Sequence, residues 1–79
     1  MIKIISENKN EIEVEVDEVG LAEALVYKLN AMKDVELANY KQIHPSKNEC
    51  IIYVKAKTPK KKIIKAAEEL IKELEKIKA

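Results

Sequence analysis

The apolar residues in the last third of the chain recur at helical spacing. Thr58 suits the N-cap of a helix and Pro59 its first turn. Beyond them, apolar residues fall on one side at Ile63, Ala67, Leu70, Leu74 and Ile77. This pattern predicts a long helix over residues 59–78. The neighbouring Ile64, Ile71 and Ala66 widen its apolar stripe to about 160°, whereas a single core face needs only roughly 100°.

Residues 1–17 have the pattern of a β-hairpin. A β-branched run over 1–6 and a strictly alternating run over 11–17 flank a polar turn at 7–10. Ile12, Val14 and Val16 would point inward. The outer face would carry an acidic row, Glu11, Glu13, Glu15 and Asp17. We expect lysines of a neighbouring strand, Lys55 and Lys57, to relieve the repulsion within this row.

A second helix is predicted from Val19–Gly20 to about Lys33, and it is apolar on nearly two sides. One broad arc contains Leu21, Ala22, Leu25, Val26, Leu29 and Met32. A second arc contains Ala24, Tyr27 and Ala31. Such a helix contacts its own sheet and a second surface.

Two further strands are predicted around a turn at 45–48. The first runs from Val35 to about His44, and Pro45 ends it because proline cannot continue the hydrogen-bond ladder. Its inward positions change parity, which predicts a bulge near Leu37–Ala38. The second runs over 49–57, with alternate residues inward at Cys50, Ile52, Val54 and Ala56.

These elements predict a single domain over 1–79 with an α+β fold. We expect a two-layer ββαββα sandwich, in which a mainly antiparallel four-stranded sheet carries both helices on one face. The surplus apolar surface of the helices would then lie on the outside of the helical layer. Exposed apolar surface of this kind predicts a protein partner.

Charge does not require a nucleic-acid partner. All 15 basic residues are lysine and there are 14 acids, so the net charge is +1. Lysines nevertheless gather where the last strand meets the last helix, at Lys57, Lys60, Lys61 and Lys62. Because a helix N-terminus is already partly positive, this cluster would face an anion: RNA, DNA or an acidic protein surface. Simple solvation of the lysines is the other interpretation.

Few residues offer chemistry. Cys50 is the only cysteine and His44 the only histidine, so a Cys–His pair would need both. Cys50 shares the parity of Ile52 and Val54, which favours a buried position. With one glycine and no metal-like spacing of ligands, we expect no cofactor and no metal. A lone cysteine and the lack of a signal or membrane-spanning pattern predict a cytoplasmic protein.

The strand before the turn carries a recognisable pattern. Ala38, Tyr40 and a closing His44-Pro45 pair resemble the subunit L family of archaeal RNA polymerase, and the order of elements is similar over nearly the whole chain. At the start of the first helix, this family has an acidic residue, His-Thr-Leu and, two residues on, Asn. Here Leu21 is kept, Val19-Gly20 replaces His-Thr, and Glu23 replaces Asn.

This resemblance implies a non-catalytic subunit that pairs through its helices with the D subunit of RNA polymerase, and through it with the large subunits. A weak homodimer is expected when the chain is alone. The predicted interface residues are Leu21, Leu25, Leu29, Met32, Ile64, Leu70, Ile71, Leu74 and Ile77. The alternatives are a dimerising subunit of the tRNA-modifying KEOPS complex, a lysine-surfaced homodimer that binds nucleic acid, and an enzyme using Cys50.

Overall fold

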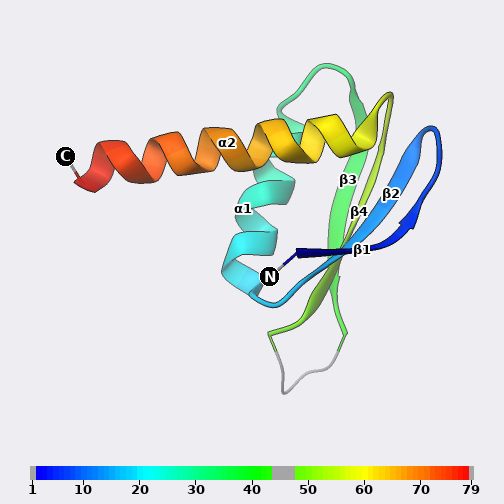
Figure 1. Cartoon of the computed structure of the whole chain (residues 1–79), viewed down its shortest axis with the longest axis horizontal. Coiled ribbons are helices and arrows are strands. Elements are labelled where there is room, and N and C mark those ends of the chain that lie inside the picture. Colours follow the sequence, from blue (N-terminus) through cyan, green and yellow to red (C-terminus); the bar gives the residue numbers. More distant parts are fainter. Residues whose placement is uncertain (1, 44–47, 79) are drawn as a thin grey trace.

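The order of elements is ββαββα in the computed structural model, which describes residues 2–43 and 48–78 (Figure 1). The elements are β1 (Ile2–Glu7), β2 (Glu11–Val16), α1 (Val19–Asn30), β3 (Val35–Gln42), β4 (Cys50–Ala56) and α2 (Pro59–Lys78). The predicted α+β class and the long last helix are confirmed. His44, Pro45 and most of the predicted turn at 45–48 lie outside the described residues.

The first helix ends earlier than predicted. After Asn30 the chain tightens into i→i+3 hydrogen bonds, in which the N–H of Ala31 donates to the Lys28 carbonyl and that of Met32 to the Leu29 carbonyl, at 3.2 and 3.1 Å. Such bonds satisfy carbonyls that a helix end leaves free. The chain can therefore turn at once toward β3.

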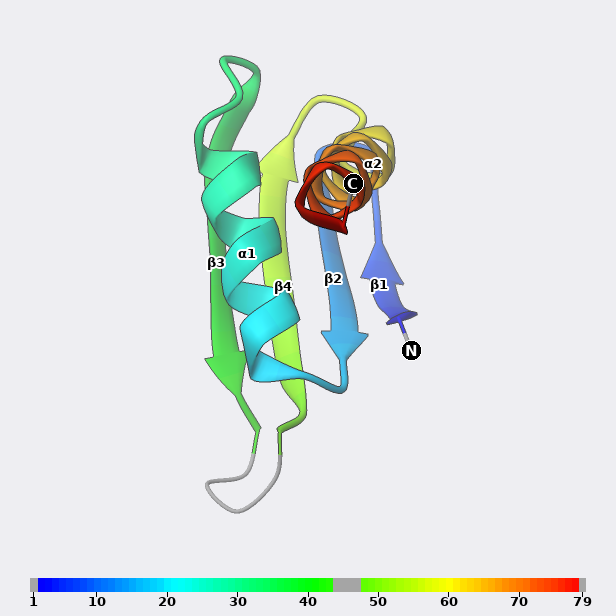
Figure 2. The same cartoon turned by 90° about the vertical axis from the view of Figure 1, so that its left-hand side faces the viewer.

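The sheet is antiparallel throughout, with strand order β1-β2-β4-β3. Figure 2 shows both helices on one side of it: α1 covers β3 and β4, and the start of α2 covers β2 and its neighbours. This arrangement confirms the predicted two layers. Inward residues of β2 and β4 face each other in register, with Val14 opposite Ile52 and Val16 opposite Cys50.

The core between the layers is aliphatic. Its largest fully buried side chains are Ile12, Leu25, Leu29, Ile52, Val14, Val16, Val54 and Cys50. Ile63 and Ala66 bring the first half of α2 into this cluster. Burying such side chains is the main favourable contribution to folding, at about 1.5–3 kcal/mol each.

The bulge in β3 lies earlier than predicted. The register shifts between Val35 and Leu37, not at Leu37–Ala38. Leu37 is consequently 46% exposed on the outer face, contrary to its predicted inward position, whereas Ala38 faces the core. The side-chain amide of Asn30 donates to the Ala38 carbonyl at 3.0 Å and accepts from the Ala38 N–H at 3.1 Å. It thereby covers part of an edge strand whose backbone groups would otherwise be open to pairing.

The acidic row lies on the outer face of the sheet. Glu11 is opposite Lys55, as expected, but Lys57 follows the end of β4 and does not face the row. The Tyr53 hydroxyl donates to the Glu11 carboxylate. This hydrogen bond is the main reason that the pKa of Glu11 lies below its usual 4.5 and that the pKa of Tyr53 lies above its usual 10.0.

The Glu11–Tyr53 hydrogen bond should contribute to the stability of the fold only within a defined pH range. A lowered carboxyl pKa stabilises the fold above about pH 4.5 and ceases to do so as pH falls through the folded value. A raised tyrosine pKa stabilises it below about pH 10 and ceases to do so as pH rises through the folded value. Tyr53→Phe should therefore destabilise the chain most between these limits.

Urea unfolding of Tyr53→Phe and the parent chain at about pH 3, 7 and 11 would measure this effect. A difference in stability that is the same at all three pH values would contradict it. Asn39→Ala, which changes a residue opposite Tyr53 on β3, is the matched control. Its effect should not follow the titration of Glu11 or Tyr53.

Candidate partner interface

The second half of α2 extends beyond the sheet. In Figure 1 this helix starts at the sheet, passes α1 and continues outward to the C-terminal end of the described chain. Its apolar residues there remain in contact with water: Ile71 is 54%, Leu74 58% and Ile77 79% exposed. Regularly spaced large apolar side chains on a projecting helix are typical of a surface that another protein covers.

A groove separates α1 from α2 at the base of this projection. Its volume is about 520 Å³, and its lining comprises Gly20, Glu23, Ala24, Tyr27, Lys28, Leu70 and Glu73. Gly20 and Ala24 lie one turn apart and have almost no side chain, so another helix can approach the α1 backbone closely. Tyr27 is 77% exposed beside them and offers a large aromatic surface.

Polar contacts fix the walls of the groove. Lys28 of α1 donates a hydrogen bond to Glu73 of α2, and this contact is the main cause of the raised pKa of Lys28. The Tyr40 hydroxyl donates to Glu23 at 2.8 Å, which ties β3 to the groove side of α1. The same hydrogen bond raises the pKa of Tyr40. Tyr40, expected from the family pattern, thus helps to position α1.

The structure divides the predicted interface residues. Ile64, Ile71, Leu74 and Ile77 are exposed, while Leu21, Met32 and Leu70 are partly buried against the chain's own core. Leu25 and Leu29 are fully buried, and their inclusion in the predicted interface was wrong. Together with Ala22 they form the side of α1 that rests on the sheet, so they offer no surface to a partner.

The predicted set also missed the outer side of α1. Gly20, Ala24 and Tyr27 line the groove, although Ala24 and Tyr27 belong to the second apolar arc visible in the sequence. That arc is the signal that could have identified them. This arc contains no large aliphatic residue, and the predicted interface set was chosen from such residues, so the arc was not included.

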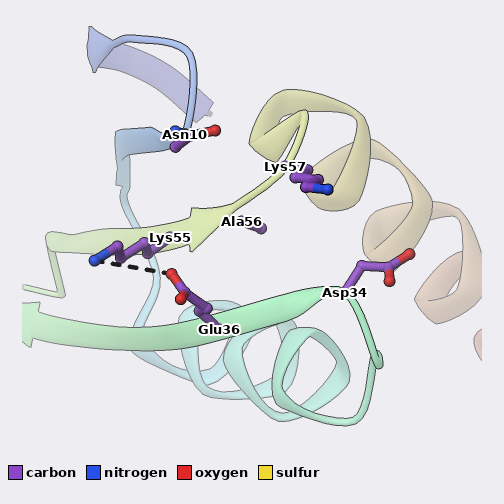
Figure 3. Close-up of a pocket in the computed structure, with 6 residues that line it drawn as sticks. All are labelled: Asn10, Asp34, Glu36, Lys55, Ala56 and Lys57. Carbon is purple, nitrogen blue, oxygen red and sulfur yellow. Dashed lines mark ion pairs between the residues drawn. The ribbon is translucent and has the colours of Figure 1, made fainter.

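The four clustered lysines do not converge on one point. Lys62 forms an ion pair with Asp34 at 3.4 Å, whereas Lys60 and Lys61 line a separate hollow beside Thr58. Lys57 faces a third hollow, of about 350 Å³, shown in Figure 3. The structure therefore gives no common anion site for all four.

The hollow in Figure 3 contains charges of both signs. Lys55 pairs with Glu36 of the neighbouring strand at 3.8 Å, and Asp34, Lys57 and Asn10 lie around this pair. Two lysines and two acids balance one another there. We find no nucleophile paired with a base among the residues that line it.

Thr58 begins α2 differently from the expectation. Its hydroxyl donates to the Lys57 carbonyl at 2.7 Å, so the side chain does not cap the helix. Its carbonyl instead accepts from the N–H groups of Lys61 and Lys62. The backbone φ of Thr58 is 47°, a left-handed conformation that is unfavourable for a β-branched residue. This turn directs α2 away from β4.

Cys50 is fully buried, which confirms its predicted core position. Its thiol lies 3.7 Å from the Asn48 carbonyl, and His44, which a catalytic Cys–His pair would need, is outside the described residues. Within 2–43 and 48–78, no three His, Cys, Asp or Glu side chains form a group able to hold a metal ion. In the same ranges, neither helix is long and apolar enough to cross a membrane.

Comparisons with known proteins agree with the geometry. A comparison with curated proteins found no match. The crystal structure of DNA-directed RNA polymerase subunit L from Thermoplasma acidophilum is similar to this chain, with a TM-score of 0.82 and 31% sequence identity. The match covers 98% of this chain and 80% of that one. The model of the RNA polymerase Rpb3/Rpb11 dimerisation domain matches residues 9–79, and the chain belongs to this family.

Proposed function

We propose that this chain is a non-catalytic assembly subunit of an archaeal-type, cytoplasmic RNA polymerase, and that it forms a heterodimer with the D subunit of that polymerase. The observation that carries the proposal is the exposed apolar half of α2 beside the groove between α1 and α2. Membership of a dimerisation-domain family supports it. The heterodimer would then present a platform to the large subunits.

The proposed contact surface combines both helices. Exposed aliphatic residues of α2 would form its centre, and the groove would receive a helix of the partner. Its members are Gly20, Leu21, Ala24, Tyr27, Met32, Ile64, Leu70, Ile71, Leu74 and Ile77. The charged pair Lys28–Glu73 at the rim would fix orientation more than it adds affinity.

Light scattering on a sizing column tests the proposal directly. The chain would be run alone, with an archaeal D subunit, and with an unrelated acidic protein of similar size. We expect a stable one-to-one complex with the D subunit only. If the D subunit does not bind while KEOPS components or RNA do, the proposed polymerase partner is wrong.

Replacement of Gly20 by leucine should raise the stability of the free chain and lower its affinity for the partner. A Cβ at this position would meet only the Glu18 carboxylate, at 3.7 Å, so a side chain fits in the free chain. Gly20→Leu should raise stability by up to about 1 kcal/mol because leucine is the better helix former. The same side chain would fill the groove and lower the affinity for the partner roughly tenfold or more.

Thermal unfolding and a binding titration would measure the two effects of Gly20→Leu. Lys72→Leu adds a leucine on the exposed, charged side of α2 and serves as the control. Equal affinities for Gly20→Leu and the parent chain would remove the groove from the interface.

A further inference from the structure

Strands β1 and β3 form the two edges of the sheet, and their outer sides differ. On β3, the side-chain amide of Asn30 occupies both the N–H and the carbonyl of Ala38. Figure 2 shows β1 as the outermost strand at the other edge, and within residues 2–43 and 48–78 no strand pairs with its outer side. An uncovered edge strand can pair with an extended segment of another chain.

The backbone of Ile4 faces this open side of β1. In an antiparallel sheet, the N–H and the carbonyl of one residue point to the same neighbouring strand, and the direction alternates along the strand. The N–H of Ala56 donates to the Asn10 carbonyl at 2.8 Å, so the even-numbered residues of β2 bond to β4. Glu15 therefore bonds to Lys3, which lies opposite it on β1. The next residue, Ile4, consequently directs its N–H and its carbonyl away from the sheet.

An apolar hollow lies beside the Ile4 side chain, on the face of the sheet that carries α2. Its volume is about 160 Å³, and its walls include Ile12 and Val14 of β2 together with Ile63 and Ala67 of α2. Ile4 itself is 44% exposed there. In a strand added beside β1, every second side chain would lie on this face. The residue opposite Ile4 would thus place its side chain at the mouth of the hollow.

The charge around β1 indicates the chemistry of the added strand. Residues 2–10 and 59–61 contain four lysines and one glutamate. Lys3 lies on the outer face of β1, and Lys60 reaches the apolar hollow from the start of α2. A second hollow, at the far end of β1, is lined in part by Glu7, Lys9, Lys60 and Lys61. This surplus of positive charge favours an acidic occupant.

We propose that the open edge of β1 binds an extended, acidic segment of another protein as a fifth strand. The segment lies antiparallel to β1, exchanges two backbone hydrogen bonds with Ile4 and places an apolar side chain at the hollow. The residue next to it places a carboxylate beside Lys3 on the outer face. The register shift between Ile4 and Ser6 limits regular pairing to the part of β1 that ends at Ile4.

This inference goes beyond the proposed polymerase function. No residue of β1 belongs to the surface proposed for the D subunit, and the hollow shares only Ile64 with that surface. Binding at the β1 edge and binding of the D subunit can therefore be measured and can fail separately.

A peptide with blocked ends and the sequence of residues 11–17 is the probe. It alternates acids with apolar residues, as does the strand with which β1 already pairs. An NMR titration of the intact chain at pH 7 would measure its binding. We expect a Kd below about 1 mM, with shifts centred on Lys3 and Ile4 and with amide exchange of Ile4 slowed about tenfold or more. A peptide with lysine in place of each acid should bind about tenfold more weakly or worse.

Substitutions on β1 test the two recognition elements. Ile4→Pro removes the outward N–H and no bond between β1 and β2, so the chain should fold and the Kd should rise about tenfold or more. Ile4→Val is the matched control, because it keeps the N–H and a β-branched side chain, and it should bind within about threefold of the parent. Lys3→Glu should raise the Kd about fivefold, since it replaces an attraction by a repulsion.

A modified peptide tests the backbone pairing without changing the protein. N-methylation of its three apolar residues removes the N–H that would donate to the Ile4 carbonyl, and this peptide should not bind. Equal binding of the N-methylated or the lysine peptide would overturn the proposal. So would shifts centred on β3 or on α1, or the absence of saturable binding by the acidic peptide.

Discussion

Replacement of Leu25 by glutamate is expected to unfold the chain. Leu25 has no exposed surface and lies in the core beneath α1, between the helix and the sheet. A carboxylate there would lose its water without gaining a partner, at a cost of several kcal/mol. A domain of 79 residues has a stability of only about 5–10 kcal/mol, so most of it would be lost.

Circular dichroism during heating would measure the loss for Leu25→Glu. We expect little helical signal and no cooperative transition. Tyr27→Glu, two residues away on the exposed side of the same helix, should unfold at nearly the temperature of the parent chain. A cooperative transition for Leu25→Glu within a few degrees of the parent would contradict the burial of this residue. If Leu25→Glu fails to bind the partner, the cause would be unfolding of the chain and not the loss of a contact with the partner.

Replacement of Ile71 by glutamate is expected to leave the fold intact and to weaken binding to the D subunit strongly. Ile71 is 54% exposed on the projecting half of α2, so its substitution should change stability by less than about 0.5 kcal/mol. In the proposed heterodimer, Ile71 would lie at the centre of the interface, out of contact with water. A glutamate there should weaken the heterodimer with the D subunit by roughly 100-fold or more.

A calorimetric titration with the D subunit would measure the binding of Ile71→Glu, with circular dichroism to confirm its fold. Lys72→Glu introduces the same side chain one residue further on, toward solvent, and should bind within about threefold of the parent. If Ile71→Glu binds the D subunit as the parent does, Ile71 is not part of the heterodimer interface.

Sequence and structure agree most closely along helix α2. The apolar stripe of residues 59–78 was too wide for one core face, and the structure divides it accordingly. Ile63 and Ala66 are buried over the sheet, while Ile64, Ile71 and Leu74 remain exposed. Periodicity reveals such a surplus because each residue advances by a fixed angle of about 100° around a helix.

Periodicity did not show which apolar residues face the chain's own sheet. Leu21 and Leu25 share an arc of α1, yet Leu25 is fully buried and Leu21 only partly. The difference depends on how α1 is rotated over β3 and β4. Contacts such as the Tyr40–Glu23 and Asn30–Ala38 hydrogen bonds fix that rotation, and they join residues 17 and 8 positions apart.

By itself, the sequence determined the order of elements, the aliphatic core of β2 and β4, and the surplus apolar surface of the helices. These properties are local, because they follow from the repeat of each element along the chain. Only the tertiary structure decided the position of the bulge in β3, the removal of Leu25 and Leu29 from the surface, and the groove formed by Gly20, Ala24 and Tyr27. All three features depend on how separate helices and strands pack against one another. The spacing of apolar residues within one helix or strand does not specify that packing.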